Sequence, residues 1–126
     1  MVFASDGPIA FIDFDFAAPG HRLEDVGYLA WSWCISSRPD RGPATEQGRQ
    51  LRILADAYGL DAADRRRVLP AVRARLSRNI NFWHRRLNLP WNGTGSGPED
   101  VVEWTHRERA YVAAHHDELA RLLEAP

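Results

Sequence analysis

A stripe of apolar side chains between residues 69 and 87 constrains the fold of this chain more than any other feature. Its members recur at spacings of three and four residues: Leu69, Val72, Leu76, Ile80, Trp83 and Leu87. That spacing is typical of one face of an α-helix, so the segment predicts a long helix packed against a core. Asp61 is placed to cap its N-terminus, and Pro70 predicts a kink or a break within it.

Three further helices are expected, at about 23–35, 45–58 and 98–114, and residues 116–123 either continue the last one or form a separate turn. The first two should bury the residues that share a helical spacing: Leu23, Val26, Ala30, Trp33, Cys34, Leu51, Leu54 and Tyr58. Gly59 supplies a C-terminal stop for the second of them. Proline and glycine between the segments indicate loops.

The N-terminal residues predict strands instead. Two short apolar runs, 2–4 and 9–12, flank Asp6-Gly7, and glycine accepts the positive φ that tight hairpin turns require. The second run is continuously apolar, which predicts a strand buried on both faces. We therefore predict a single α+β domain over residues 1–126, mostly α-helical, with a β-hairpin at about 2–13 and four to five helices within about 21–123.

Composition narrows the classes of function. Seventeen acidic and sixteen basic residues nearly cancel, so the charge indicates neither nucleic acid nor a membrane surface as a partner. No secretory signal or membrane-spanning run is present, and a cytoplasmic location is expected. The single cysteine, Cys34, excludes an internal disulfide and a multi-cysteine metal site. All sixteen basic residues are arginine, so a step that needs lysine must obtain it from outside these residues.

Asp13 and Asp15 give the sharpest chemical signal in the chain. Two carboxylates at positions i and i+2 after a buried strand are held at a fixed place. Their oxygen atoms suit Mg²⁺, which usually keeps water and substrate phosphates as its remaining ligands. The alternative is that both residues simply begin a loop, with one of them capping the following turn.

The residues around this aspartate pair resemble those of a known family. Residues 11–20 read Phe-Ile-Asp-Phe-Asp-Phe-Ala-Ala-Pro-Gly, and residues 22–31 read Arg-Leu-Glu-Asp-Val-Gly-Tyr-Leu-Ala-Trp. An apolar strand, an Ile-Asp-Phe-Asp sequence, a Pro-Gly turn and an aspartate opening a helix together resemble the aminoglycoside phosphotransferase and choline kinase-like family, which shares the protein-kinase architecture. The resemblance is close over residues 7–35 and looser over the rest of the chain.

The resemblance implies roles for three aspartates. Asp13 matches the kinase aspartate that holds Mg²⁺ against the terminal phosphates of the nucleotide, and Asp15 stands beside it as an auxiliary ligand. Asp25 matches a family aspartate that supports the catalytic loop by hydrogen bonding to its backbone amides. Mg²⁺ and ATP are the implied cofactors, the implied partner is a small-molecule hydroxyl acceptor, and the helices resemble the C-terminal lobe of the kinase-like fold.

The catalytic loop of that family, His-x-Asp-x-x-x-x-Asn, has no match in this chain. In the family this loop precedes the hairpin, and the nucleotide-binding lobe with its phosphate-contacting lysine precedes the loop. We therefore expect a fragment or truncated member that contains the C-terminal lobe and no catalytic residue. Residues 1–126 alone should be inactive and should bind neither Mg²⁺ nor ATP.

Two other functions stay open from the residues. A haloacid-dehalogenase-like phosphatase would use Asp13 as nucleophile and Asp15 as acid and base, although Phe16-Ala17 departs from its motif. A non-catalytic helical module would bind a partner through an apolar face.

Two sets of side chains are candidates for the walls of a binding site. Because the family's acceptor cleft is usually acidic for cationic acceptors, three carboxylates come into question: Glu99, Asp100 and Glu103. Aromatic residues could line a pocket for a cation or a sugar, although their helical spacing favours core packing: Trp31, Trp33, Trp83 and His84.

Overall fold

The computed structural model describes residues 2–4, 7–10 and 20–126. Two strands come first, β1 (Val2–Ala4) and β2 (Gly7–Ala10). They pair antiparallel as a two-stranded sheet, with Ala4 opposite Gly7.

The predicted α+β class is wrong. From Gly20 to Pro126 the structure contains helices and loops and no strand. Strands of three and four residues are too few and too short to supply a sheet layer. The two strands fall within the hairpin expected at about 2–13, but they do not make the fold α+β, and the described body over residues 20–126 is all-α.

The helical part begins with α1 (Arg22–Leu29), which continues directly into a π-helical turn, η1 (Ala30–Cys34). At its start, the Leu23 amide donates to Nδ1 of His21 at 3.2 Å. At its end, the Ile35 amide donates to the carbonyl of Ala30, five residues earlier, at 2.9 Å. This i→i−5 hydrogen bond makes the turn wider than an α-helical one.

The widened turn changes which tryptophan is buried. A π turn advances each side chain by a smaller angle than an α turn does. Trp33 therefore rotates out of the stripe that the sequence predicts for it and is 58% exposed, whereas Trp31 is 8% exposed. The inward position expected for Trp33 is wrong for this reason.

A loop containing the short 3₁₀ segment η2 (Pro39–Arg41) leads into α2 (Ala44–Ala57), and α3 (Ala62–His84) follows. Asp61 caps α3 as expected, because its Oδ1 accepts from the Asp64 amide at 2.8 Å. Of the kink or break predicted at Pro70, the break is absent, since α3 runs through this residue. Pro70 lies on the exposed side, where water can bond the carbonyl that the proline leaves free.

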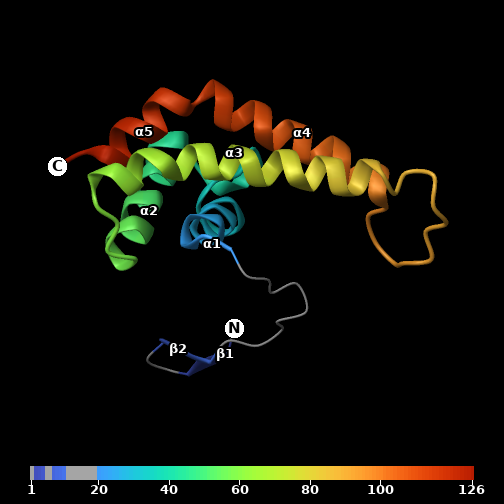
Figure 1. The fold of residues 1–126 in the computed structure, drawn as a ribbon, viewed down its shortest axis with the longest axis horizontal. Helices are drawn as coiled ribbons and strands as arrows, with labels where there is room; N and C mark the ends of the chain where they lie inside the picture. Colours follow the sequence, from blue (N-terminus) through green and yellow to red (C-terminus); the bar gives the residue numbers. More distant parts are fainter. Residues whose placement is uncertain (1, 5–6, 11–19) are drawn as a thin grey trace.

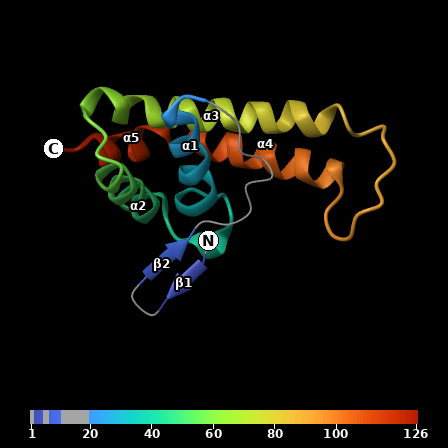
Figure 2. The ribbon, with the colours of Figure 1, turned by 60° about the horizontal axis from the view of Figure 1, so that its bottom comes forward.

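The last two helices are α4 (Pro98–Ala114) and α5 (His116–Glu124). Figure 1 shows α3 and α4 running side by side along the long axis, with α5 next to α2 and the loop 85–97 beyond the far end. The turned view in Figure 2 shows α1 packed across α3. Every helix of the described residues is too short or too polar to traverse a lipid bilayer.

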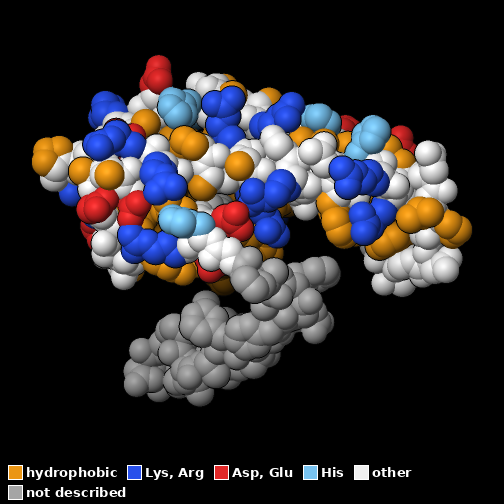
Figure 3. Space-filling view, in the orientation of Figure 1, with side chains coloured by type: hydrophobic (Ala, Val, Ile, Leu, Met, Phe, Trp, Pro, Cys, Tyr) orange, Lys and Arg blue, Asp and Glu red, His pale blue; other side chains and the backbone are white. Residues whose placement is uncertain are grey.

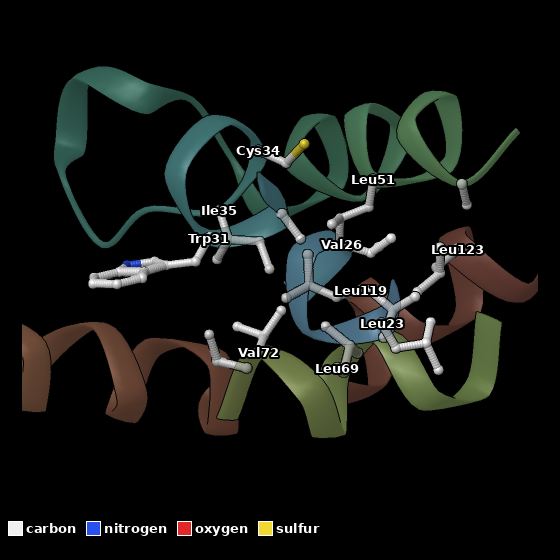
Figure 4. Close-up of a cluster of buried hydrophobic side chains, with 14 of the residues drawn as sticks. Leu23, Val26, Trp31, Cys34, Ile35, Leu51, Leu69, Val72, Leu119 and Leu123 are labelled. Carbon is white, nitrogen blue, oxygen red and sulfur yellow. The ribbon is translucent and has the colours of Figure 1, made fainter. Parts of the chain in front are cut away.

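The core lies where α1, α2, α3, α4 and α5 meet (Figure 4). Its fully buried side chains come from α1, the residue after η1, α2, α3, α4 and α5: Val26, Ile35, Leu51, Val68, Val72, Leu76, Val112, Leu119 and Leu123. One of the helix pairs approaches closely because it has glycine at the contact. A Cβ atom on Gly48 of α2 would lie 2.6 Å from Cδ1 of Leu122 on α5.

Candidate functional site

A groove of about 740 Å³ opens between α1 with its π turn, the loop that follows, α3 and α4. Its aromatic lining gathers from three helical segments: Tyr28, Trp31, Phe82, Trp83 and Trp104. Four arginines line it as well: Arg38, Arg41, Arg75 and Arg78. The volume is that of a site for a small organic molecule.

The aromatic floor of the groove is continuous with the core. The ring centroids of Trp31 and Trp104 lie 5.3 Å apart with the planes tilted by 31°. Tyr28 meets Trp31 edge to face, with the centroids 6.3 Å apart. In Figure 4 the Trp31 indole lies at one end of the cluster and is directed away from the labelled aliphatic side chains. Trp31 therefore belongs both to the core and to the groove.

The loop after the π turn forms one wall, and Gln47 of α2 fixes it from below. Oε1 of Gln47 accepts from the Ser36 amide at 3.0 Å. Its Nε2 donates to the carbonyls of Ser36 at 3.1 Å and Gly42 at 3.0 Å. Gln47 is fully buried, so these bonds replace the water that the loop backbone would otherwise need.

Glu108 of α4 fixes the same loop from the other side. Its carboxylate accepts from the Ser37 amide at 3.2 Å and from the Ser37 hydroxyl at 2.9 Å. Glu108 is also fully buried. Arg38 and Arg41 are thus carried on a loop that is bonded to two helices.

The arginines are held to different degrees. Nη2 of Arg41 donates to the Trp33 carbonyl at 2.7 Å, and Arg38 pairs with exposed Asp40 at 2.8 Å. Cζ of Arg75 lies 4.5 Å from the ring centroid of Tyr28, a cation–π contact. Among the described residues, Arg78 makes no ion pair and no hydrogen bond through its side chain. Sequence reasoning missed this set, although Arg75, Arg78 and Phe82 share one face of α3 by their spacing.

Cys34 is buried in the core and does not line the groove. Burial raises the pKa of its thiol to about 11, against an opposing effect of the nearby Arg41 charge. A thiol that stays protonated at neutral pH is unreactive. Its role is packing in the core.

Of the three predicted aspartates, only Asp25 is among the described residues, and it does not line the groove. Asp13 and Asp15 lie outside the described residues. Asp25 lies in the first turn of α1, where a carboxylate suits the helix N-terminus, and its side chain is exposed. Within residues 20–126 its carboxylate accepts no hydrogen bond from a side chain or a loop amide.

The side chains considered as walls of a binding site lie in different places. Glu99 and Asp100 border a smaller hollow with Leu87 and Trp91, and Glu103 pairs with Arg107 at 2.9 Å. None of these three carboxylates lines the groove. Trp31 and Trp83 line it, whereas Trp33 and His84 do not. In the part of the chain that the structure describes, no three histidine, cysteine, aspartate or glutamate side chains gather as metal ligands.

Comparison with known proteins gives one match. The model of the phosphotransferase enzyme family matches residues 1–71, which is more than half of the chain. The matched region includes Asp13, Asp15 and Asp25 and reaches into α3. No curated protein and no solved structure matches the chain.

Proposed function

Because the chain belongs to the phosphotransferase enzyme family, we propose that it takes part in transferring the γ-phosphate of ATP to a hydroxyl group of a small molecule. The observation that carries this proposal is the family match over residues 1–71, which contains the sequence Ile12-Asp13-Phe14-Asp15. The cytoplasm, where ATP is supplied, is the location that we propose.

Asp13 and Asp15 are the proposed metal ligands. Two carboxylates two positions apart in the sequence are a donor set that fits Mg²⁺, a hard cation that prefers oxygen. Mg²⁺ bound there would supply the positive charge that offsets the nucleotide's terminal phosphates. Asp13 contacts the metal directly in this proposal, Asp15 assists it, and Asp25 holds the neighbouring loop in place.

The remaining parts of the reaction need residues that these 126 do not contain. The sequence has no His-x-Asp-x-x-x-x-Asn pattern and no lysine. In the proposed reaction, the aspartate base for the acceptor hydroxyl and the lysine that grips the phosphates are supplied from outside residues 1–126. Residues 1–126 alone then transfer no phosphate.

The first test is calorimetric titration of purified residues 1–126 with ATP and Mg²⁺, together with an assay of ATP turnover. We expect no turnover and no binding of ATP that depends on Mg²⁺. Turnover that Asp13→Asn abolishes would contradict the proposal that the base and the phosphate-binding lysine come from outside residues 1–126.

The second test uses the reading frame extended through its in-frame upstream codons. There, Asp13→Asn should reduce ATP-dependent phosphorylation by about a thousandfold, since it removes the direct metal ligand. Asp117→Asn is the matched control, because Asp117 is an exposed carboxylate on α5. Equal activity of the two variants would contradict the metal role of Asp13.

A further inference from the structure

The groove between α1, α3 and α4 has a one-sided charge. Its lining contains four arginines and no aspartate or glutamate. Of these four arginines, only Arg38 has a carboxylate partner among the described residues, the exposed Asp40. Figure 3 shows arginine side chains, in blue, recurring along α3 beside hydrophobic ones in orange. Positive charge concentrated over low-polarity walls attracts anions and repels cations.

Two of these arginines lie on the same helix, α3. Arg75 and Arg78 are three residues apart on α3 and therefore project from the same face. Arg75 is oriented by its stacking over Tyr28 at 4.5 Å. Guanidinium groups bind carboxylate and phosphate oxygens through paired hydrogen bonds, which makes them suited to a shared anion.

The rest of the lining favours an apolar, flat molecule. Trp31 and Trp104 present two indole rings 5.3 Å apart, and Phe82 and Trp83 stand edge to face, also with centroids 5.3 Å apart. Rings of this kind stack on planar groups and bury a large apolar area. The two helices that carry Phe82, Trp83 and Trp104 are joined beside the groove, since Nδ2 of Asn79 on α3 donates to Oγ1 of Thr105 on α4 at 3.0 Å.

The geometry points to a binding site for a small organic anion. A planar, apolar body lies against Trp31 and Trp104, and a carboxylate or phosphate group is bound by Arg75 and Arg78. This ligand class is opposite in charge to the cationic acceptors for which Glu99, Asp100 and Glu103 came into question. The inference does not depend on the proposed phosphoryl transfer, because binding is measurable in residues 1–126 alone.

The test is titration of residues 1–126 with four naphthalene probes, monitored by calorimetry and by the indole N–H signals in NMR spectra. 2-Naphthoate and 1-naphthyl phosphate carry the two anionic groups, 2-naphthalenemethanol is neutral, and 2-naphthylmethylamine is cationic. Since a hydrogen bond between two charged groups is stronger than one to a neutral group, the better anion should bind at least about tenfold more tightly than the neutral probe. The better of the two anions identifies the group that the site prefers.

The variants locate the site. Arg78→Gln, which loses no hydrogen bond to a described residue, should weaken binding of the anion about tenfold and leave binding of the neutral probe unchanged. Arg75→Lys keeps the charge and loses the paired geometry, so an intermediate loss is expected. The matched control is Arg66→Gln with Arg73→Gln, two exposed arginines of α3 outside the groove, which should alter affinity by less than about twofold.

The indole signals give a readout that is independent of affinity. Those of Trp31 and Trp104 should shift on addition of the anion, while that of Trp33, which lies outside the groove, should not. Equal affinity for neutral and anionic probes, tighter binding of the cationic probe, or equal losses in the Arg78 variant and the control would each overturn the inference.

Discussion

The indole rings of Trp31 and Trp104 lie 5.3 Å apart, with their planes tilted by 31°, at the place where the hydrophobic core ends and the groove begins. Trp31 comes from the π turn after α1, and Trp104 comes from α4. Because both rings serve the core and the groove, changes at this contact should affect stability and ligand binding together.

Trp31→Ala should lower the free energy of unfolding by about 3–5 kcal/mol, since it empties a buried aromatic site. Trp33→Ala, in the same π turn, is the matched control and should change it by less than about 0.5 kcal/mol, because Trp33 is 58% exposed. Urea unfolding followed by circular dichroism measures both. Equal losses would show that the π turn does not place these side chains as described.

Glu108→Ala should lower the free energy of unfolding by about 1–3 kcal/mol, because it leaves the Ser37 amide and hydroxyl without their buried partner. Hydrogen exchange at the Ser37 amide should become faster at the same time. The control is Glu103→Ala on the same helix, where the carboxylate is exposed and, among the described residues, pairs with Arg107 alone. A Ser37 amide that exchanges at the same rate in both variants is the outcome that speaks against this anchor.

Gly48→Ala should destabilise the chain by about 1–3 kcal/mol, since the new Cβ would lie 2.6 Å from Cδ1 of Leu122. Leu122→Ala removes that atom. In the double variant the combined loss should therefore be smaller than the sum of the two single losses. Additive losses would indicate that α2 and α5 do not meet at this pair.

Cys34 should resist alkylation by iodoacetamide at pH 8 in the folded chain and react readily in urea, since burial raises the pKa of its thiol to about 11. The thiol ionises at a lower pH in the unfolded chain, near the ordinary value of 9.0. Its stabilising contribution is therefore complete below about pH 9 and is lost as the pH rises through about 11. Comparing Cys34→Ala with the parent chain across this range isolates the effect; identical pH profiles would contradict it.

The sequence predicted the helices well where their periodicity is local. The expected segment 45–58 corresponds to α2 (Ala44–Ala57). The apolar stripe from Leu69 to Ile80 forms the buried side of α3, as expected. The stripe fails toward its end, because α3 stops at His84 and Leu87 is 38% exposed. Tyr58, expected inside, lies just beyond α2 and is 41% exposed. Helix ends are set by packing and capping, which spacing alone does not encode.

The groove could not be predicted in the same way. Its arginines and tryptophans come from η1, the following loop, α3 and α4, and only the tertiary arrangement brings them together. The π turn, which decides between Trp31 and Trp33, leaves no distinct periodic signal in five residues. The family, in contrast, was predictable, because the Ile-Asp-Phe-Asp sequence and the residues after it form a contiguous pattern.

The most direct measurement of the proposed function is the nucleotide sequence immediately upstream of the codon for Met1. If these residues serve phosphoryl transfer from ATP, the upstream codons should encode His-x-Asp-x-x-x-x-Asn in the same reading frame, with a lysine-containing nucleotide-binding region before it. In-frame stop codons directly before Met1, with no such pattern, would contradict the account.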